Sequence, residues 1–371
     1  MIQPLPDLIF TFPHAGNTSF TLQQLIRSDS SPADEYIAGI SRILKWWYDS
    51  PEPLVMTTSG TTGTPVSNIF ERDQVIAAAR SSMPLIGPPE NGTSLLAIHP
   101  DYAGGRMLLI RALLAGNHLI CVPPMANPLR LMPQISIDYA SFVPYQLAEI
   151  LKDEDSTERL SSIKTVLIGG AAISEKDWLQ LCTLPNRIFS TYGMTETLSH
   201  VALRRATPEE EGYIPVPGIS LSSDARGCLV VESEWLGKII TNDMVDWFRD
   251  QEDHRSFIWR GRADTIINSG GILVSPEQIE SKLSNFFTRH PEVTGYFITS
   301  EPDERLGNRV VLYVEYNNGQ QGTNLVDELQ AHCRRHFRKE EIPRQIEIRK
   351  QFIRTGSGKI DRRRTAADHA D

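Results

Sequence analysis

Short apolar runs take turns with segments of helical periodicity between residues 94 and 181, and this alternation limits the fold more than any other feature of the chain. A strand that is buried on both faces reads as a continuous apolar run, so the alternation predicts a mainly parallel sheet covered by helices. The expected strands are Ser94–Ile98, His118–Val122, Tyr139–Val143 and Lys164–Ile168, and the expected helices are Gly104–Leu114, Tyr145–Leu151 and Ser174–Leu181. An amphipathic helix is also expected over Asp34–Tyr48.

The pattern changes after Leu198, where short apolar segments are separated by Gly, Asn and Asp. Strands are expected at Leu229–Glu232, Lys238–Ile240 and Ser256–Trp259, which predicts a β-rich subdomain behind the α/β core. We place a domain boundary near Arg262–Asp264. The prediction is therefore a large α/β N-terminal domain, residues 1–263, and a small C-terminal α+β lid, residues 264–371.

The lid is expected to open with a capped helix. Ser275-Pro276-Glu277-Gln278 has the form of a capping box with proline at the first helical position. Strands are expected at Val293–Ile298 and Val310–Glu315, followed by a helix at Leu325–Phe337. About a hundred residues is a normal size for such a domain.

Composition and charge narrow the class of protein. The chain has 371 residues of which 40% are hydrophobic, enough for two cores, and a net charge of −9 that argues against nucleic acid or anionic membranes as partners. The four cysteines lie far apart without CxxC spacing, which indicates reduced thiols rather than a disulfide framework or a zinc site; they are Cys121, Cys182, Cys228 and Cys333. The most apolar stretch, Met107–Val122, contains Arg111, Asn117 and His118. We therefore expect a cytoplasmic protein without stable membrane insertion; the sequence indicates no oligomeric state.

The segment Thr57–Pro65, Thr-Thr-Ser-Gly-Thr-Thr-Gly-Thr-Pro, follows the apolar residues Leu54-Val55-Met56 and predicts a phosphate-binding loop after a strand. Glycines allow backbone N–H groups to converge on one point, and hydroxyls add neutral donors. A Ser/Thr/Gly linker is the alternative, but a helix expected over Ser67–Ser82 favours the loop. The Gly-Lys pair at Gly358-Lys359 lacks the flanking residues of a Walker loop.

This loop resembles the phosphate-binding signature of the acyl-adenylate-forming ligases, the superfamily of acyl-CoA synthetases, luciferases and peptide-synthetase adenylation domains. The resemblance implies that ATP, Mg²⁺ and coenzyme A are bound with a small carboxylic acid, and that the N-terminal domain has the adenylate-forming fold. Where the family usually has Pro-Lys, this chain has Pro65-Val66. The loop residues implied to bind phosphate are Ser59, Gly60, Thr61, Thr62 and Gly63.

Further motifs recur in the order of that family. Gly170, Ala171 and Ala172 follow an expected strand and are implied to border the adenine. In Ser190-Thr191-Tyr192-Gly193-Met194-Thr195-Glu196, the resemblance assigns stacking on adenine to Tyr192, contact with the α-phosphate to Thr195 and Mg²⁺ binding to Glu196. Thr191 and Gly193 belong to the same nucleotide-binding segment. A buried aromatic residue beside a solvated turn is the alternative for this motif.

The remaining motifs are those for binding the ribose, for the hinge between the domains and for the lysine used in adenylation. Thr241-Asn242-Asp243 resembles the family's Thr-Gly-Asp, so Asp243 is implied to accept the ribose hydroxyls and Arg262 to contact the ribose. The resemblance makes Asp264 the hinge and places Gly270 and Gly271 beside the pantetheine tunnel. Lys359, flanked by glycine, matches the lysine that bridges the carboxylate and the α-phosphate during adenylation.

Within the superfamily the sequence most resembles the o-succinylbenzoate-CoA ligases of menaquinone synthesis. The resemblance rests on Ala140–Leu147, Val166–Ile173 and Ser269-Gly270-Gly271, although only some fifty residues precede the phosphate loop. The acyl pocket is implied to involve Tyr102, where a histidine is usual, with Arg106, Arg111, Ser199 and His200. An arginine fork suits a second substrate carboxylate. Two alternatives remain: an aryl- or fatty-acyl-CoA ligase, and a nucleotide-binding regulatory protein without catalysis.

Overall fold

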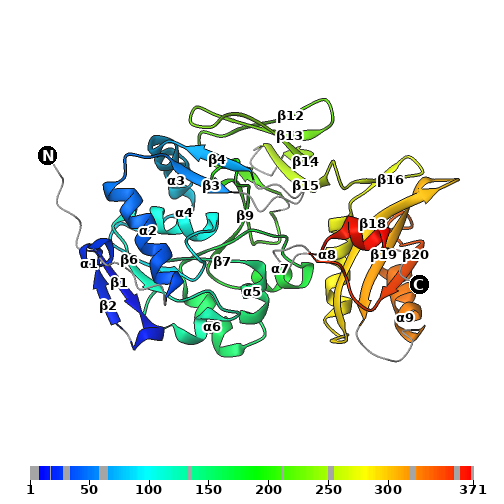
Figure 1. Cartoon of the computed structure of the whole chain (residues 1–371), viewed down its shortest axis with the longest axis horizontal. Helices are drawn as coiled ribbons and strands as arrows, with labels where there is room; N and C mark the ends of the chain where they lie inside the picture. The colour runs from blue at the N-terminus through cyan, green and yellow to red at the C-terminus, as the bar shows by residue number, and fades with distance from the viewer. Residues whose placement is uncertain are drawn as a thin grey trace.

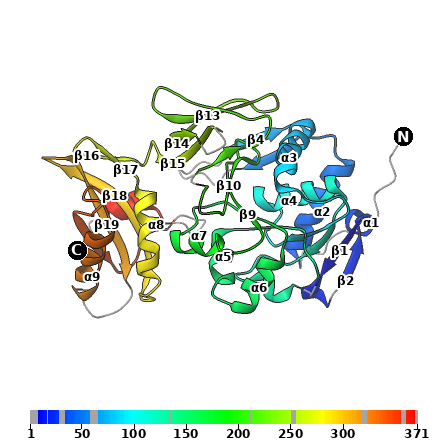
Figure 2. The same cartoon turned by 180° about the vertical axis from the view of Figure 1, so that it is seen from behind.

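The computed structural model describes residues 8–16, 18–27, 34–57, 66–132, 135–210, 212–249, 255–316, 323–354 and 360–368. In these ranges a large N-terminal part is followed by a smaller C-terminal part, which lies at one end of the molecule (Figure 1). The view from behind shows the same separation, with β12–β15 along the edge between them (Figure 2). The structure confirms the expected fold class, a mainly parallel α/β part with a small α+β unit.

The main sheet has nine described strands in the order β11-β10-β9-β8-β7-β5-β6-β1-β2. Its parallel strands are β1 (Ile9–Phe12), β5 (Thr93–Leu96), β6 (His118–Cys121), β7 (Tyr139–Phe142), β8 (Thr165–Ile168) and β9 (Arg187–Gly193). Antiparallel strands close both edges: β2 (Thr18–Thr21), β10 (His200–Arg205) and β11 (Ile214–Pro215). The carboxyl ends of the central strands therefore lie on one edge of the sheet.

Successive residues of the central strands enter two different hydrophobic cores. In β8, for example, Leu167 belongs to one core whereas Val166 and Ile168 belong to the other, because side chains alternate across a strand. The first core is covered by α1 (Leu22–Arg27), α2 (Glu35–Asp49), α3 (Arg72–Ile86) and α4 (Ala103–Ala115). The second is covered by α5 (Pro144–Ile150), α6 (Glu154–Ser162) and α7 (Glu175–Leu181). Two 3₁₀ turns, η1 (Pro13–Ala15) and η2 (Pro128–Leu131), complete this part.

The expected strands and helices of this region are confirmed, with one correction. The helix expected over Ser67–Ser82 is wrong at its start, because β4 (Ser67–Phe70) pairs antiparallel with β3 (Leu54–Thr57). The helix begins only at Arg72, after Glu71, whose backbone N–H donates to the Gln74 side chain at 2.8 Å. Strand pairing satisfies backbone groups that an isolated helical turn would leave open. The phosphate loop itself, from residue 58 to residue 65, lies outside the described residues.

A four-stranded antiparallel sheet follows in the order β12-β13-β14-β15. Its strands are β12 (Ser220–Ser223), β13 (Cys228–Ser233), β14 (Gly237–Arg249) and β15 (Arg255–Arg262). The β-rich subdomain is thus confirmed, but β14 is much longer than the expected Lys238–Ile240. Its register shifts between Met244 and Val245, a bulge that bends a long strand.

The C-terminal unit has its own core beneath a mixed sheet. The strands are β16 (Ile267–Ser269), β17 (Ile272–Val274), β18 (Val293–Asp303), β19 (Gly307–Tyr316) and β20 (Gln345–Arg349), and the helices are α8 (Pro276–Phe287), α9 (Thr323–His336) and α10 (Arg362–Ala367). Ser275 caps α8 by accepting from the Gln278 N–H at 3.3 Å, but the Gln278 side chain donates to the Trp259 carbonyl instead of closing the capping box. The boundary at residues 263 and 264 stays a prediction. No helix in the described ranges is both long and apolar enough to cross a membrane.

Candidate active site

A cavity of about 550 Å³ lies where the carboxyl ends of the parallel strands meet the start of α4. It is lined by the segments that leave β5, β7, β8 and β9, represented by Ile98, Val143, Gly170 and Met194. Ligands in open α/β sheets characteristically bind at this edge. The topology thus brings residues from five distant stretches of the chain to one cavity.

Several predicted site residues line this cavity together. They are Tyr102, Arg111, Gly170, Thr191, Gly193, Thr195, Ser199 and His200. Residues not predicted for the site, such as Met107 from α4 and Phe142 from β7, add apolar surface. A pocket that is largely apolar with a few converging polar groups is the usual form of a small-molecule site.

At one end of the cavity, Arg111 of α4 is 2% exposed. Its guanidinium donates to the Ser82 hydroxyl at 3.2 Å and to the Ser199 hydroxyl at 2.6 Å. Within the described part of the chain its hydrogen-bond partners are neutral, and no carboxylate lies within ion-pair distance of it. Burial lowers the pKa of Arg111, yet an arginine keeps its charge in a protein. The cavity therefore contains a buried cation that lacks a described anionic partner.

His200 lies beside this cation, with 3.5 Å between its Nε2 and an Arg111 terminal nitrogen. Because a guanidinium can only donate, Nε2 must accept, and the ring is neutral with its proton on Nδ1. Burial first and then the charge of Arg111 lower the pKa of His200 well below 6.5. His200 pairs with Gly193 of β9, and the register between the two strands shifts between His200 and Ala202.

The loop from Met194 to Ser199 is held in shape by a residue that the sequence did not single out, the buried Thr197. Its hydroxyl accepts from the Met194 N–H at 2.9 Å and lies 2.8 Å from the Ser199 carbonyl. Leu198 has a φ of 64°, which is costly for a branched residue and is found mainly where the surroundings enforce it. This loop presents Thr195 to the cavity, while Glu196 is exposed and makes no hydrogen bond or ion pair with the described residues.

Two glycines allow β9 to approach its neighbours closely. A Cβ on Gly169 would lie 2.1 Å from the Thr191 hydroxyl oxygen, and a Cβ on Gly193 would lie 2.4 Å from the Ser199 carbonyl oxygen. Glycine backbone therefore makes up part of the cavity wall beside Gly170 and Thr191. A flat ring fits such a wall.

The predicted ribose ligands are neighbours. Asp243 and Arg262 face each other in the register of β14 and β15. Asp243 is buried and accepts a hydrogen bond from the Tyr192 hydroxyl at 2.5 Å. Burial and then the Asp243 charge raise the pKa of that tyrosine. Arg262 donates two hydrogen bonds to Asp264, at 2.9 and 3.0 Å.

Other predicted residues lie elsewhere. The Arg106 guanidinium does not line the cavity, because it donates to the carbonyls of Pro100, Val55 and Asp101 at 3.2, 3.3 and 3.0 Å. Ala171 and Ala172 are exposed and do not line it. Gly270 and Gly271 form the turn of the β16–β17 hairpin, which points away from the N-terminal part in Figures 1 and 2. Ser59, Gly60, Thr61, Thr62, Gly63 and Lys359 lie outside the described residues.

Comparison with known proteins supports the same class. The model of the AMP-binding enzymes matches residues 50–232, and that of the AMP-binding enzyme C-terminal domain matches residues 282–359. An acyl-CoA synthetase (AMP-forming)/AMP-acid ligase II-like protein from Dyadobacter fermentans is 31% identical in sequence and superposes with a TM-score of 0.57, covering 92% of this chain and 97% of that one. The chain belongs to the AMP-binding enzymes, the family of adenylate-forming ligases.

Two further similarities involve one substrate. A probable 2-succinylbenzoate–CoA ligase from Mycobacterium tuberculosis is 28% identical over 336 residues, which are 85% of this chain and 84% of that ligase. The o-succinylbenzoate CoA synthetase from Bacillus subtilis, solved with its acyl-adenylate intermediate, is 20% identical with a TM-score of 0.69 and covers 85% of this chain and 69% of that one. Another structure of the Bacillus enzyme holds ATP and a magnesium ion. At 20% identity, the structural likeness shows the fold alone.

Proposed function

We propose that this chain is an acid–thiol ligase that activates a substrate with two carboxylates, with o-succinylbenzoate as the first candidate. One carboxylate reacts with ATP to form acyl-AMP and pyrophosphate, and the thiol of coenzyme A then displaces AMP. The 2-succinylbenzoate ligase named above supports this substrate at 28% identity.

The observation that carries the proposal is Arg111, a buried cation whose hydrogen-bond partners are the neutral residues Ser82, Ser199 and His200. A buried charge without a counter-charge is costly, and an incoming carboxylate removes that cost while it gains charge-assisted hydrogen bonds. A fatty acid would place apolar atoms against the guanidinium. The cavity therefore favours an acid with a second negative charge.

A second set of residues is suited to hold the nucleotide; Gly170 and Thr191 line the cavity, whereas Asp243 and Glu196 do not. Gly170 and Thr191 offer a flat wall for the adenine, and Asp243 offers carboxylate oxygens to the ribose hydroxyls. Glu196, exposed and unpaired among the described residues, fits the role of a Mg²⁺ ligand, since hard cations prefer carboxylate oxygen. Bound Mg²⁺ would neutralise phosphate charge. Thr195 would orient the α-phosphate, and Lys359 would stabilise negative charge there during adenylation.

The second half-reaction requires the small unit to move. The β16–β17 hairpin, with Gly270 and Gly271 at its turn, points away from the cavity (Figures 1 and 2), whereas the proposed role of these glycines is to border the thiol tunnel. We infer rotation about Asp264 between the two steps, as lid movements commonly separate steps of a reaction. Arg262 and Asp264 form an exposed ion pair at this boundary.

A panel of acids tests the proposal. Formation of AMP and of the CoA thioester is measured with o-succinylbenzoate, benzoate and a medium-chain fatty acid. We expect turnover with o-succinylbenzoate to exceed the others at equal concentration. If only benzoate or the fatty acid were turned over, the ligase class would stand but the proposed dicarboxylate substrate would be wrong. If no acid supports pyrophosphate exchange into ATP, the chain is a nucleotide-binding protein without ligase activity, a reading favoured by Val66 in place of the usual loop lysine.

A further inference from the structure

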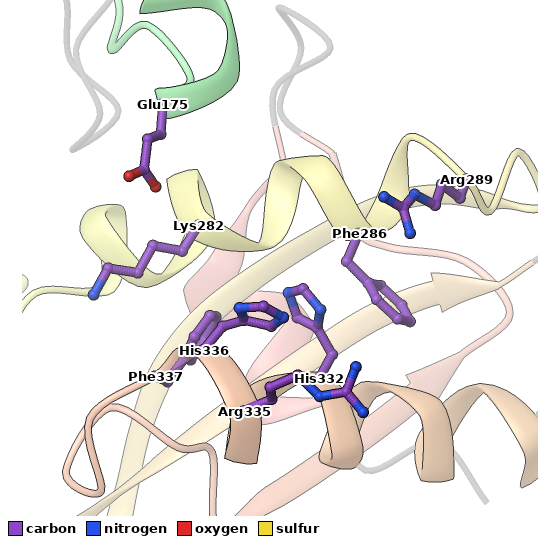
Figure 3. Close-up of a pocket in the computed structure, with 8 residues that line it drawn as sticks. All are labelled: Glu175, Lys282, Phe286, Arg289, His332, Arg335, His336 and Phe337. Carbon is purple, nitrogen blue, oxygen red and sulfur yellow. The ribbon is translucent and has the colours of Figure 1, made fainter. Parts of the chain in front are cut away.

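A second cavity, of about 580 Å³, lies between α7 of the N-terminal part and the helices α8 and α9 of the C-terminal unit. It shares no lining residue with the candidate active site. Figure 3 shows Glu175 reaching from α7 toward α8, with rings and long basic side chains gathered around α8 and α9. The proposed ligase chemistry gives this cavity no role.

The cavity is basic in a chain whose net charge is −9. Arg289, just after α8, and Arg335 on α9 both line it, and neither side chain forms an ion pair or hydrogen bond with any residue in the described ranges. Lys282 contributes a third cation, 2.8 Å from the buried carboxylate of Glu341, which also accepts from Arg338 at 2.8 Å. One carboxylate thus serves two cations, and the cavity keeps an excess of positive charge.

Rings form the wall between these cations. Phe286 lies 5.1 Å from His332 and His332 lies 4.6 Å from His336, measured between ring centroids. Phe337 adds a further ring, with the Lys282 ammonium 5.8 Å from its centroid. Aromatic surface beside free cations is the combination that binds a flat base together with its phosphates.

The histidine pair raises the alternative of a metal site, because residues 332 and 336 are one helical turn apart. The described residues contain no group of three or more His, Cys, Asp or Glu side chains placed to hold a metal ion. Arg289, Arg335 and Lys282 would also repel a cation. The charge of the cavity therefore favours an anion.

We propose that this cavity binds a phosphate-bearing ligand with a flat ring, a nucleotide in chemical class, between α8 and α9. The arginines would hold the phosphate, since their forked donors match its geometry. Glu175 is the lining carboxylate that opposes such a ligand, and it comes from the other part of the molecule. Binding should therefore weaken the present approach of α7 to α8, which couples occupancy to the placement of the C-terminal unit.

The test is a titration of the full chain with adenosine 3′,5′-bisphosphate or inorganic phosphate at constant ionic strength, without AMP, which would compete for the cavity. The ring signals of His332 and His336 measure the affinity at this cavity separately from binding at the active site. Arg289→Gln with Arg335→Gln should weaken binding about tenfold or more, by loss of charge-assisted hydrogen bonds. Glu175→Gln should tighten it roughly two- to threefold, as for an exposed charge. Arg334→Gln on the same helix, outside the cavity, is the matched control and should change little.

Bisphosphate binding that is equal in the wild type and the double arginine variant, or that leaves both histidine signals unmoved, would overturn the proposal. Weaker binding in Glu175→Gln would overturn the role of Glu175. The bound nucleotide could be the nucleotide end of coenzyme A or a separate molecule, and the KM for coenzyme A distinguishes the two. This measurement rests on the proposed ligase function. A raised KM in the double variant identifies the nucleotide end of the co-substrate, whereas an unchanged KM with lost bisphosphate binding identifies a separate nucleotide; both support the site.

Discussion

The hydroxyl of Tyr192, the second-last residue of β9, donates a 2.5 Å hydrogen bond to the carboxylate of Asp243 on β14. This bond joins the parallel sheet to the four-stranded sheet. It occupies one oxygen of the residue proposed to bind the ribose, and no side chain in the described ranges bonds to the other oxygen. Two residues of the proposed nucleotide site, neither of which lines the cavity, are thereby held together across two sheets.

We expect Asp243→Asn to raise the Kd for AMP about tenfold to a hundredfold, because hydrogen bonds to a charged group contribute about 1.5–3 kcal/mol. Tyr192→Phe should raise it only a few-fold, since the carboxylate and the ring both remain. Calorimetric titration with AMP measures both values. Equal affinity in Asp243→Asn and wild type would remove Asp243 from the ribose site.

Gly193→Ala should damage both stability and substrate binding. The new Cβ would lie 2.4 Å from the Ser199 carbonyl oxygen and 2.6 Å from the His200 Cα, so the backbone that places these two partners of Arg111 must shift. Overpacking of this kind costs about 1–3 kcal/mol, measured by denaturant unfolding. Gly104→Ala in the same cavity is the control, because its Cβ would meet only the Ile98 side chain at 3.5 Å. Similar unfolding free energies in the two variants would contradict the close approach of β9 and β10.

His200 should make stability depend on pH below neutrality. Its folded pKa lies well below 6.5 because of burial and Arg111, so below pH 6.5 the unfolded chain binds a proton that the folded chain does not. The unfolding free energy therefore falls as the pH drops from 6.5 toward the folded pKa, by at most about 1.4 kcal/mol per pH unit for this group. Denaturant unfolding between pH 7 and pH 5 should show a smaller decrease in His200→Gln. An identical pH dependence in both proteins would mean that folding does not lower the pKa of His200.

Asp264→Pro should block one half-reaction, because proline fixes φ at the proposed pivot. Asp264→Ala is the matched control, since it removes the ion pair with Arg262 but leaves the backbone free. Acyl-AMP formation and thioester formation from preformed acyl-AMP are measured separately in each variant. Normal rates of both steps in Asp264→Pro would place the pivot elsewhere.

The sequence predicted many residues that line the cavity, but not the side chains and strand pairing that support them. Gly170, Thr191 and Thr195 meet because parallel strands end on one edge, which alternation of strands and helices implies. Ser82 gave no signal, because one serine on an amphipathic helix is unremarkable until α3 packs against α4. Ser67–Phe70 was expected to be helical because the spacing of Val75, Ile76 and Ala79 was extended backward, whereas pairing with β3 decides its structure. Tertiary contacts override local preference in each case.

The central claim is that Arg111 selects an acid with a second carboxylate. Removing this charge leaves ATP binding untouched, because Arg111 lies at the acyl end of the cavity, so Arg111→Leu should keep the KM for ATP within a few-fold. Its effect should instead fall on the discrimination between o-succinylbenzoate and single-carboxylate analogues.

The most direct measurement is kcat/KM for o-succinylbenzoate, 3-benzoylpropionate and 2-butyrylbenzoate in wild type and Arg111→Leu. The two analogues lack the ring carboxylate and the chain carboxylate respectively. We predict that the wild type prefers the diacid over whichever analogue keeps the reacting carboxylate. We also predict that Arg111→Leu loses about a hundredfold or more of that preference, since breaking a buried ion pair costs about 3–5 kcal/mol. An unchanged preference in Arg111→Leu, or a wild type that does not distinguish the diacid from that analogue, would contradict the account.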